Sequence, residues 1–113
     1  MIVDWEPTLM EILRDLERGE NAGKISARFH NTLAEMILAV ARVVDVPRVL
    51  LTGGCFQNRY LTERCVNRLT AASFRPYWHQ RVPPNDGGIA LGQVIGAAAR
   101  MKANEKQEAM IAA

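Results

Sequence analysis

The chain has 113 residues, 49% of them hydrophobic and 23% charged, with a formal net charge of +2. These values are typical of one small globular domain and argue against a disordered chain. Basic residues are interleaved with acidic ones, which argues against the basic surface stripe of a nucleic-acid-binding protein. No apolar run approaches the roughly 20 residues of a membrane span, which argues against a membrane anchor. No signal peptide is evident, so the sequence predicts a cytoplasmic protein whose two cysteines, Cys55 and Cys65, stay reduced.

The first predicted element is a helix over residues 5–18. Asp4 is the expected N-cap, because its carboxylate can accept from the unpaired amides of the first turn. Gly19 is expected to end the helix. The apolar face predicted by the spacing consists of Leu9, Ile12, Leu13 and Leu16.

A longer helix is predicted from a cap at Asn21 to about Val44, ahead of Pro47. Apolar residues recur along it every three or four positions, and this spacing predicts one continuous buried stripe. The stripe consists of Ile25, Phe29, Leu33, Met36, Val40 and Val43.

Two short strands flank a third helix. The first covers residues 48–52, and its three consecutive apolar residues predict a strand covered on both faces. The second covers residues 74–78, and Pro76 within it favours a sheet edge. The helix between them is expected to bury Leu61, Cys65, Leu69 and Ala72.

A fourth helix is predicted to start at or beside Asp86. Residues 1–102 are expected to form the domain, and residues 103–113 either extend this last helix or form a disordered tail. Glycines recur along the helix every four positions and form a ridge without side chains. We expect another element of a soluble core to pack closely against this ridge. The ridge consists of Gly88, Gly92 and Gly96.

The predicted order is helix, helix, strand, helix, strand, helix. This is an α/β arrangement in which the helical crossover makes the two strands parallel. Two strands make a poor sheet, because three or more are generally needed for independent stability. Open strand edges also recruit other chains. We therefore expect a homodimer, or pairing with a further polypeptide that completes the sheet.

A glycine motif, LTGGCFQN over residues 51–58, follows the first strand. It places Gly53 and Gly54 where the strand ends and a helix begins. Ligands of open α/β sheets bind at this end of the strands, and glycines let a phosphate approach the following helix closely. A tight turn without a ligand also explains the pair, so both interpretations stay open.

A second motif, VPPNDGGIALGQ over residues 82–93, lies between the second strand and the fourth helix. Asp86 is either an N-cap or a carboxylate at the mouth of a cleft, where it could bind a divalent metal. Asn85 beside it could orient a ribose or a phosphate. Both motifs follow the carboxyl ends of neighbouring parallel strands, so we expect them to face one cleft.

These two motifs resemble the closing motifs of the HypF-type carbamoyltransferases, and the segments DWEP and ARFHNTLA upstream are similar to that family in the same order. The resemblance covers about residues 4–100. It implies an actin-like fold, here a partial C-terminal lobe. It also implies a reaction in which carbamoyl phosphate and ATP give carbamoyl-adenylate. The carbamoyl group then passes to the C-terminal cysteine of a HypE-type partner in nickel–iron hydrogenase maturation.

The resemblance assigns roles to residues by position. Asp86 matches a carboxylate that ligates a divalent metal, and Cys55 stands where a small apolar residue is expected, which favours a packed thiol over a nucleophile. The residues that match the two nucleotide-contacting loops are Gly53, Gly54, Asn58, Asn85 and Gly87.

The chain also departs from the family pattern. The family's metal site needs a His-x-x-x-His pair, whereas the two histidines here, His30 and His79, lie far apart in the sequence. His30 is therefore expected to be a packing or surface residue. The first hypothesis is a nucleotide- and metal-site fragment, inactive alone, whose metal site is completed only by a missing lobe. The alternative is a non-catalytic interaction module that pairs with itself or with that lobe.

Overall fold

The computed structural model describes residues 2–112, in four helices, two strands and two short 3-10 turns. The turns are η1 (Gly54–Gln57) and η2 (Asp86–Gly88). The helices and strands, in chain order, are α1 (Glu6–Glu17), α2 (Ala22–Val44), β1 (Arg48–Leu51), α3 (Arg59–Ala71), β2 (Arg75–Trp78) and α4 (Ile89–Ala112).

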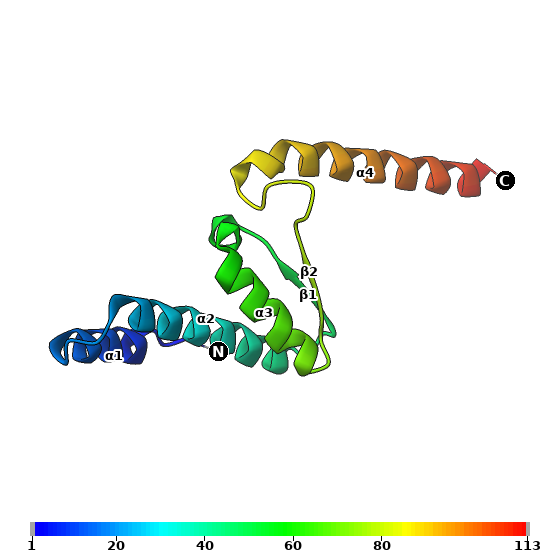
Figure 1. The fold of residues 1–113 in the computed structure, drawn as a ribbon. Helices are drawn as coiled ribbons and strands as arrows, with labels where there is room; N and C mark the ends of the chain where they lie inside the picture. The colour runs from blue at the N-terminus through cyan, green and yellow to red at the C-terminus, as the bar shows by residue number, and fades with distance from the viewer. Residues whose placement is uncertain (1, 113) are drawn as a thin grey trace.

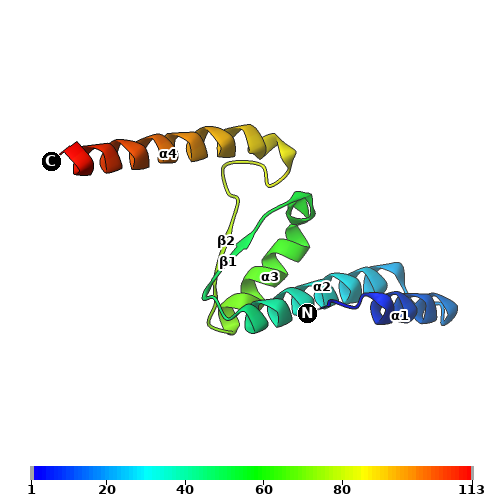
Figure 2. The ribbon, with the colours of Figure 1, turned by 180° about the vertical axis from the view of Figure 1, so that it is seen from behind.

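The molecule is extended. Its radius of gyration is 19.7 Å, whereas a compact domain of this length would have about 13 Å. Figures 1 and 2 show why: α1, α2, α3 and the two strands lie together, while α4 projects away from them beyond the end of the strands.

The two N-terminal helices begin differently, because only the N-cap residue of α2 makes a side-chain cap hydrogen bond. Asn21 caps α2 as predicted, accepting the Gly23 N–H at 2.8 Å. The N-cap of α1 is Trp5, so the prediction that Asp4 occupies this position is wrong by one residue. The Asp4 carboxylate nevertheless accepts the Glu6 N–H at 3.0 Å, which satisfies one of the first-turn donors.

An ion pair links α1 to α2. Asp15 is only 5% exposed, and its Oδ2 lies 2.6 Å from Nη1 of Arg28. The Asp15 carboxylate raises the pKa of Arg28, chiefly through this hydrogen bond. The apolar face predicted for α1 is mostly open, since its exposed members are Leu9, Leu13 and Leu16.

The core is small and lies where α2, α3 and β1 meet. The buried α3 residues are those predicted, except that Ala72 is only partly buried. The prediction for α2 is wrong, because the buried face lies beside the predicted stripe, whose members are half-buried or exposed. Seven residues make up the buried cluster: Ala34, Leu38, Ala41, Leu51, Leu61, Cys65 and Leu69.

The two strands are parallel, as predicted, with Arg48 opposite Arg75 and Leu51 opposite Trp78. Helices cover one face only. Leu51 is 2% exposed, whereas Leu50 is 65% exposed. The prediction that β1 is covered on both faces is therefore wrong, because α2 and α3 both pack on the same side of the sheet.

Along each strand, the backbone N–H and C=O groups of successive residues point alternately toward the partner strand and toward the free edge of the sheet. Arg75 N–H donates to Pro47 O at 2.7 Å, so the backbone groups of Arg75 face β1. Those of Pro76, the next residue, face away, which explains why a residue without an N–H is tolerated there. By the same alternation, Arg48 and Leu50 direct their backbone groups to the free edge of β1.

Helix α4 continues through Ala112, so residues 103–112 extend it. All of its side chains that the structure describes are exposed. A Cβ built at Gly92 or Gly96 would meet nothing within 4 Å, so of the three ridge glycines only Gly88 is closely packed within residues 2–112. Within that same range, none of the helices combines the length and apolarity needed to span a bilayer.

Candidate functional site

The two glycine motifs meet at the carboxyl end of the sheet. Gly53 N–H donates to Pro84 O at 2.8 Å, which joins the loop after β1 to the loop after β2. A second link lies beside it, where Thr52 Oγ1 and His79 Nε2 are 2.9 Å apart. The structure therefore places segments 27 or more residues apart in the sequence side by side.

The first loop has an open outer surface. Gly53 has φ +102°, a conformation that side chains other than glycine rarely adopt. A Cβ built at Gly54 would meet nothing within 4 Å, and its backbone does not require glycine. No contact among residues 2–112 thus explains a glycine at position 54, whereas the close approach of a ligand would.

The cysteines occupy opposite environments. Cys55 is exposed at the start of η1, so the prediction of a packed thiol there is wrong. In this turn the neighbouring residue, Phe56, packs against the core instead. Cys65 lies in the core instead, where burial raises the pKa of its thiol.

Asn58 closes the first loop and caps α3. Its Oδ1 accepts the Leu61 N–H at 3.0 Å, and its Nδ2 lies 2.9 Å from Nε2 of His30. From the sequence, His30 is expected only to pack or to lie at the surface. Its contact with Asn58 spans 28 positions, so no local pattern could have revealed it.

The second loop is held by Asn85. This residue caps η2, accepting the Gly87 N–H on Oδ1 at 3.0 Å. Asp86 is therefore not an N-cap. Of the two roles considered for it, a helix cap and a metal ligand, the first is wrong. Gly88 packs tightly, since a Cβ there would lie 2.8 Å from Pro83 O. Asp86 itself is exposed.

The residues described do not form a metal site on their own. Nowhere in residues 2–112 do three His, Cys, Asp or Glu side chains gather closely enough to hold a metal ion. Asp86 could at most contribute one oxygen ligand, and a metal at this position would need further ligands from another chain or segment.

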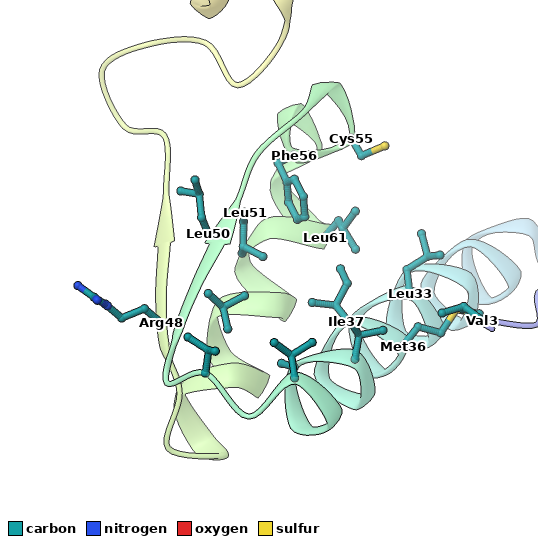
Figure 3. A pocket seen from close by; sticks show the side chains of 15 residues that line it. Val3, Leu33, Met36, Ile37, Arg48, Leu50, Leu51, Cys55, Phe56 and Leu61 are labelled. Atoms are coloured by element: carbon teal, nitrogen blue, oxygen red, sulfur yellow. The ribbon is translucent and has the colours of Figure 1, made fainter. Parts of the chain in front are cut away.

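An apolar groove runs beside β1, on its free edge. It has a volume of about 690 Å³ and is bounded by α2, β1 and the loop through η1. Figure 3 shows Phe56 and Leu61 at one wall and Ile37 at the other, while the Arg48 side chain points away. The α2 residues that line the groove are Leu33, Met36, Ile37, Val40, Ala41 and Val44.

Comparison with known proteins gives a consistent set of relatives. A family described as "Carbamoyltransferase, Kae1-like Domain, second subdomain" matches residues 1–93. Carbamoyltransferase HypF of Synechocystis sp. is 38% identical over 95 residues, which are 84% of this chain and 12% of that protein. Carbamoyltransferase HypF2 of Cupriavidus necator is 39% identical over 90 residues, or 76% of this chain and 11% of that protein.

A solved structure is similar in fold as well as in sequence. The crystal structure of full-length HypF in the phosphate- and nucleotide-bound form matches with a TM-score of 0.75 and 40% identity. The match covers 80% of this chain and 15% of that one. The chain thus spans 11–12% of the length of the two curated relatives above.

Proposed function

The chain belongs to the HypF carbamoyltransferase family, and from this membership we propose that it supplies one wall of a nucleotide-binding cleft in a HypF-type enzyme. The observation that carries the proposal is the Gly53–Pro84 hydrogen bond, which joins the two glycine loops at the carboxyl ends of parallel strands. Ligands of open α/β sheets bind at this end. The relative solved in a phosphate- and nucleotide-bound form supports the same choice of ligand.

The proposed ligand is ATP or carbamoyl-adenylate. Gly54 leaves room for a phosphate at the first loop, and Asn85 and Gly87 shape the second loop opposite it. Asp86 would give one ligand to a divalent metal completed by a further lobe; no chemical step is assigned to this metal. The architecture proposed for the complete lobe is actin-like, of which this chain would form the last two strands and their helices.

For the complete protein, the proposed reaction follows the family. Carbamoyl phosphate and ATP would give carbamoyl-adenylate, and the carbamoyl group would pass to the C-terminal cysteine of a HypE-type partner during hydrogenase maturation. The contribution of residues 2–112 would be to bind and orient the nucleotide. Catalytic groups would come from elsewhere, because among these residues only Asp86 brings a carboxylate to the two loops.

We expect the chain to bind ATP weakly, with a Kd of about 1 mM, or roughly 4 kcal/mol. One wall of a cleft offers few contacts, so the affinity should be low. Nuclear magnetic resonance (NMR) titration should shift amide signals of residues 53–58 and 85–88. Gly54→Ala should abolish these shifts, because its methyl group occupies the open space that a phosphate would use.

Gly96→Ala is the matched control. Gly96 is equally open but lies on α4, away from both loops, so this variant should bind as the unaltered chain does. Shifts that cluster elsewhere, or a Gly54→Ala variant that binds normally, would contradict the proposed site.

We expect no carbamoyl-phosphate-dependent release of pyrophosphate from ATP by the 113-residue chain alone. The reason is that Asp86 has no companion ligands among the described residues, so the metal that would neutralise the phosphate charge is not held. The assay is run on protein free of full-length family members. Release in proportion to the concentration of the chain would contradict the expectation.

The alternative function is a non-catalytic interaction module, and the apolar groove beside β1 favours it. We propose a second copy of the chain as the occupant. The free edge of β1 offers unpaired backbone groups at Arg48 and Leu50, and a two-fold axis would pair this edge with itself in an antiparallel manner. The result is a four-stranded sheet, and three or more strands are generally needed for a sheet to be stable.

A further inference from the structure

A chain of hydrogen bonds joins α2 to the first glycine loop. At one end, the Ser26 carbonyl oxygen lies 2.7 Å from Nδ1 of His30. At the other, the Leu61 N–H donates to Oδ1 of Asn58. Between them, Nδ2 of Asn58 lies 2.9 Å from Nε2 of His30. We call these contacts the His30–Asn58 relay.

The two backbone groups at its ends fix the polarity of the relay. A carbonyl oxygen only accepts, so Nδ1 of His30 must carry the hydrogen that Ser26 receives. The Leu61 N–H only donates, so the Asn58 oxygen faces Leu61 and the amide nitrogen faces His30. Nε2 of a neutral imidazole with a protonated Nδ1 is an acceptor, and Asn58 supplies its donor. The Ser26 hydroxyl also lies near Nδ1, but at 3.5 Å it is the more distant partner. The direction of each hydrogen bond in the relay is therefore fixed by the two backbone groups.

The relay differs from the other polar links between α2 and α3. Tyr60 Oη donates to Asn31 Oδ1 at 3.1 Å, and Arg68 pairs with Glu35 further along the helices. These two links join one helix surface to another. The His30 link instead ends on Asn58, the residue at which η1 ends and α3 begins.

We propose that His30 is a positioning residue that fixes the Asn58 side chain, and through it the first glycine loop. Asn58 then holds the loop in shape, with its Oδ1 on the Leu61 N–H and its Nδ2 on His30. The part of this inference that concerns nucleotide rests on the proposed function. The part that concerns loop shape does not.

The first test needs no nucleotide. Nitrogen NMR of the His30 ring in the 113-residue chain should show a protonated Nδ1 and an unprotonated Nε2. His30→Ala should shift the amide signals of residues 54–58, and His30→Gln should restore them in part, because its side-chain oxygen can accept from Asn58. Tyr60→Phe is the control: it removes the parallel link between the same helices and should leave those signals in place.

The second test is a double-mutant cycle on ATP affinity. His30→Ala and Asn58→Ala should each weaken binding about fivefold, the value of one hydrogen bond of ordinary strength. The double variant should be weakened no more than either single variant, because the two residues act as a unit. If Asn58→Ala weakens binding and His30→Ala does not, His30 does not position Asn58 for the nucleotide and this part of the proposal is overturned.

The outcomes separate the relay from the proposed function. An Nε2-protonated ring, or loop signals that His30→Ala leaves unmoved, overturns the relay. If the unaltered chain shows no ATP-dependent shifts, the proposed function fails while the nucleotide-free test still decides the relay. Should His30→Ala fail to fold, His30→Phe takes its place, since phenylalanine keeps a ring against Phe29 and Tyr60 but cannot accept from Asn58.

Discussion

At micromolar concentration, the 12.6 kDa chain is expected to sediment as a homodimer, and Met36→Glu is expected to convert it into a monomer. Met36 lines the apolar groove beside β1. Covering even a few hundred Å² of such surface stabilises association by several kcal/mol, at roughly 25 cal/mol per Å². A buried, unpaired carboxylate there would offset most of that gain, so association should weaken on the order of a hundredfold or more.

Ala39→Glu is the matched control for this experiment. Ala39 lies on the same helix but on its exposed side, outside the groove, so the same added charge should leave the dimer intact. A cooperatively folding monomer of the unaltered chain would contradict the proposal of a second copy. A monomer that instead binds the remainder of a HypF-type protein would identify that lobe as the occupant.

Leu69→Ala is expected to lower the free energy of unfolding by about 2–5 kcal/mol, as large-to-small substitutions in protein cores do. Leu69 is fully buried, and the core around it has only seven buried members. The total stability of a small domain is of the order of 5–15 kcal/mol, so one such cavity should remove a large share of it. Urea denaturation followed by circular dichroism measures the change.

Leu50→Ala makes the same chemical change on the opposite face of the sheet. Leu50 is 65% exposed, so its truncation should alter stability by about 0.5 kcal/mol or less in the monomer. Both variants are measured over a range of protein concentrations, because dimer formation adds to the apparent stability. Equal effects of the two substitutions would mean that β1 is covered on both faces in solution.

Local signals in the sequence were sufficient for the secondary structure. The periodic spacing of apolar residues predicted α1 and α2 to within one or two residues, and Asn21 marked the start of α2 correctly. The crossover helix between two short strands predicted their parallel pairing. These features depend on dihedral preferences and on capping groups a few positions apart, so the sequence carries them directly.

The same local signals were too coarse to choose a cap residue. Asp4 and Asp86 both lie next to helical turns, yet the caps are Trp5 and Asn85. Several small polar residues in one turn can accept from its amides, and the backbone angles at each position decide between them. The Cys55 thiol also depended on this geometry, because η1 turns it outward.

The sequence by itself therefore determined the order of helices and strands, the family, and the positions of the two glycine loops in the chain. Only the tertiary structure decided which face of α2 is buried, which side of β1 is open, and that His30 reaches Asn58. Helix α2 is apolar on two adjoining faces, and the choice between them depends on where α3 packs. A contact between residues 28 positions apart likewise exists only once both helices are in place.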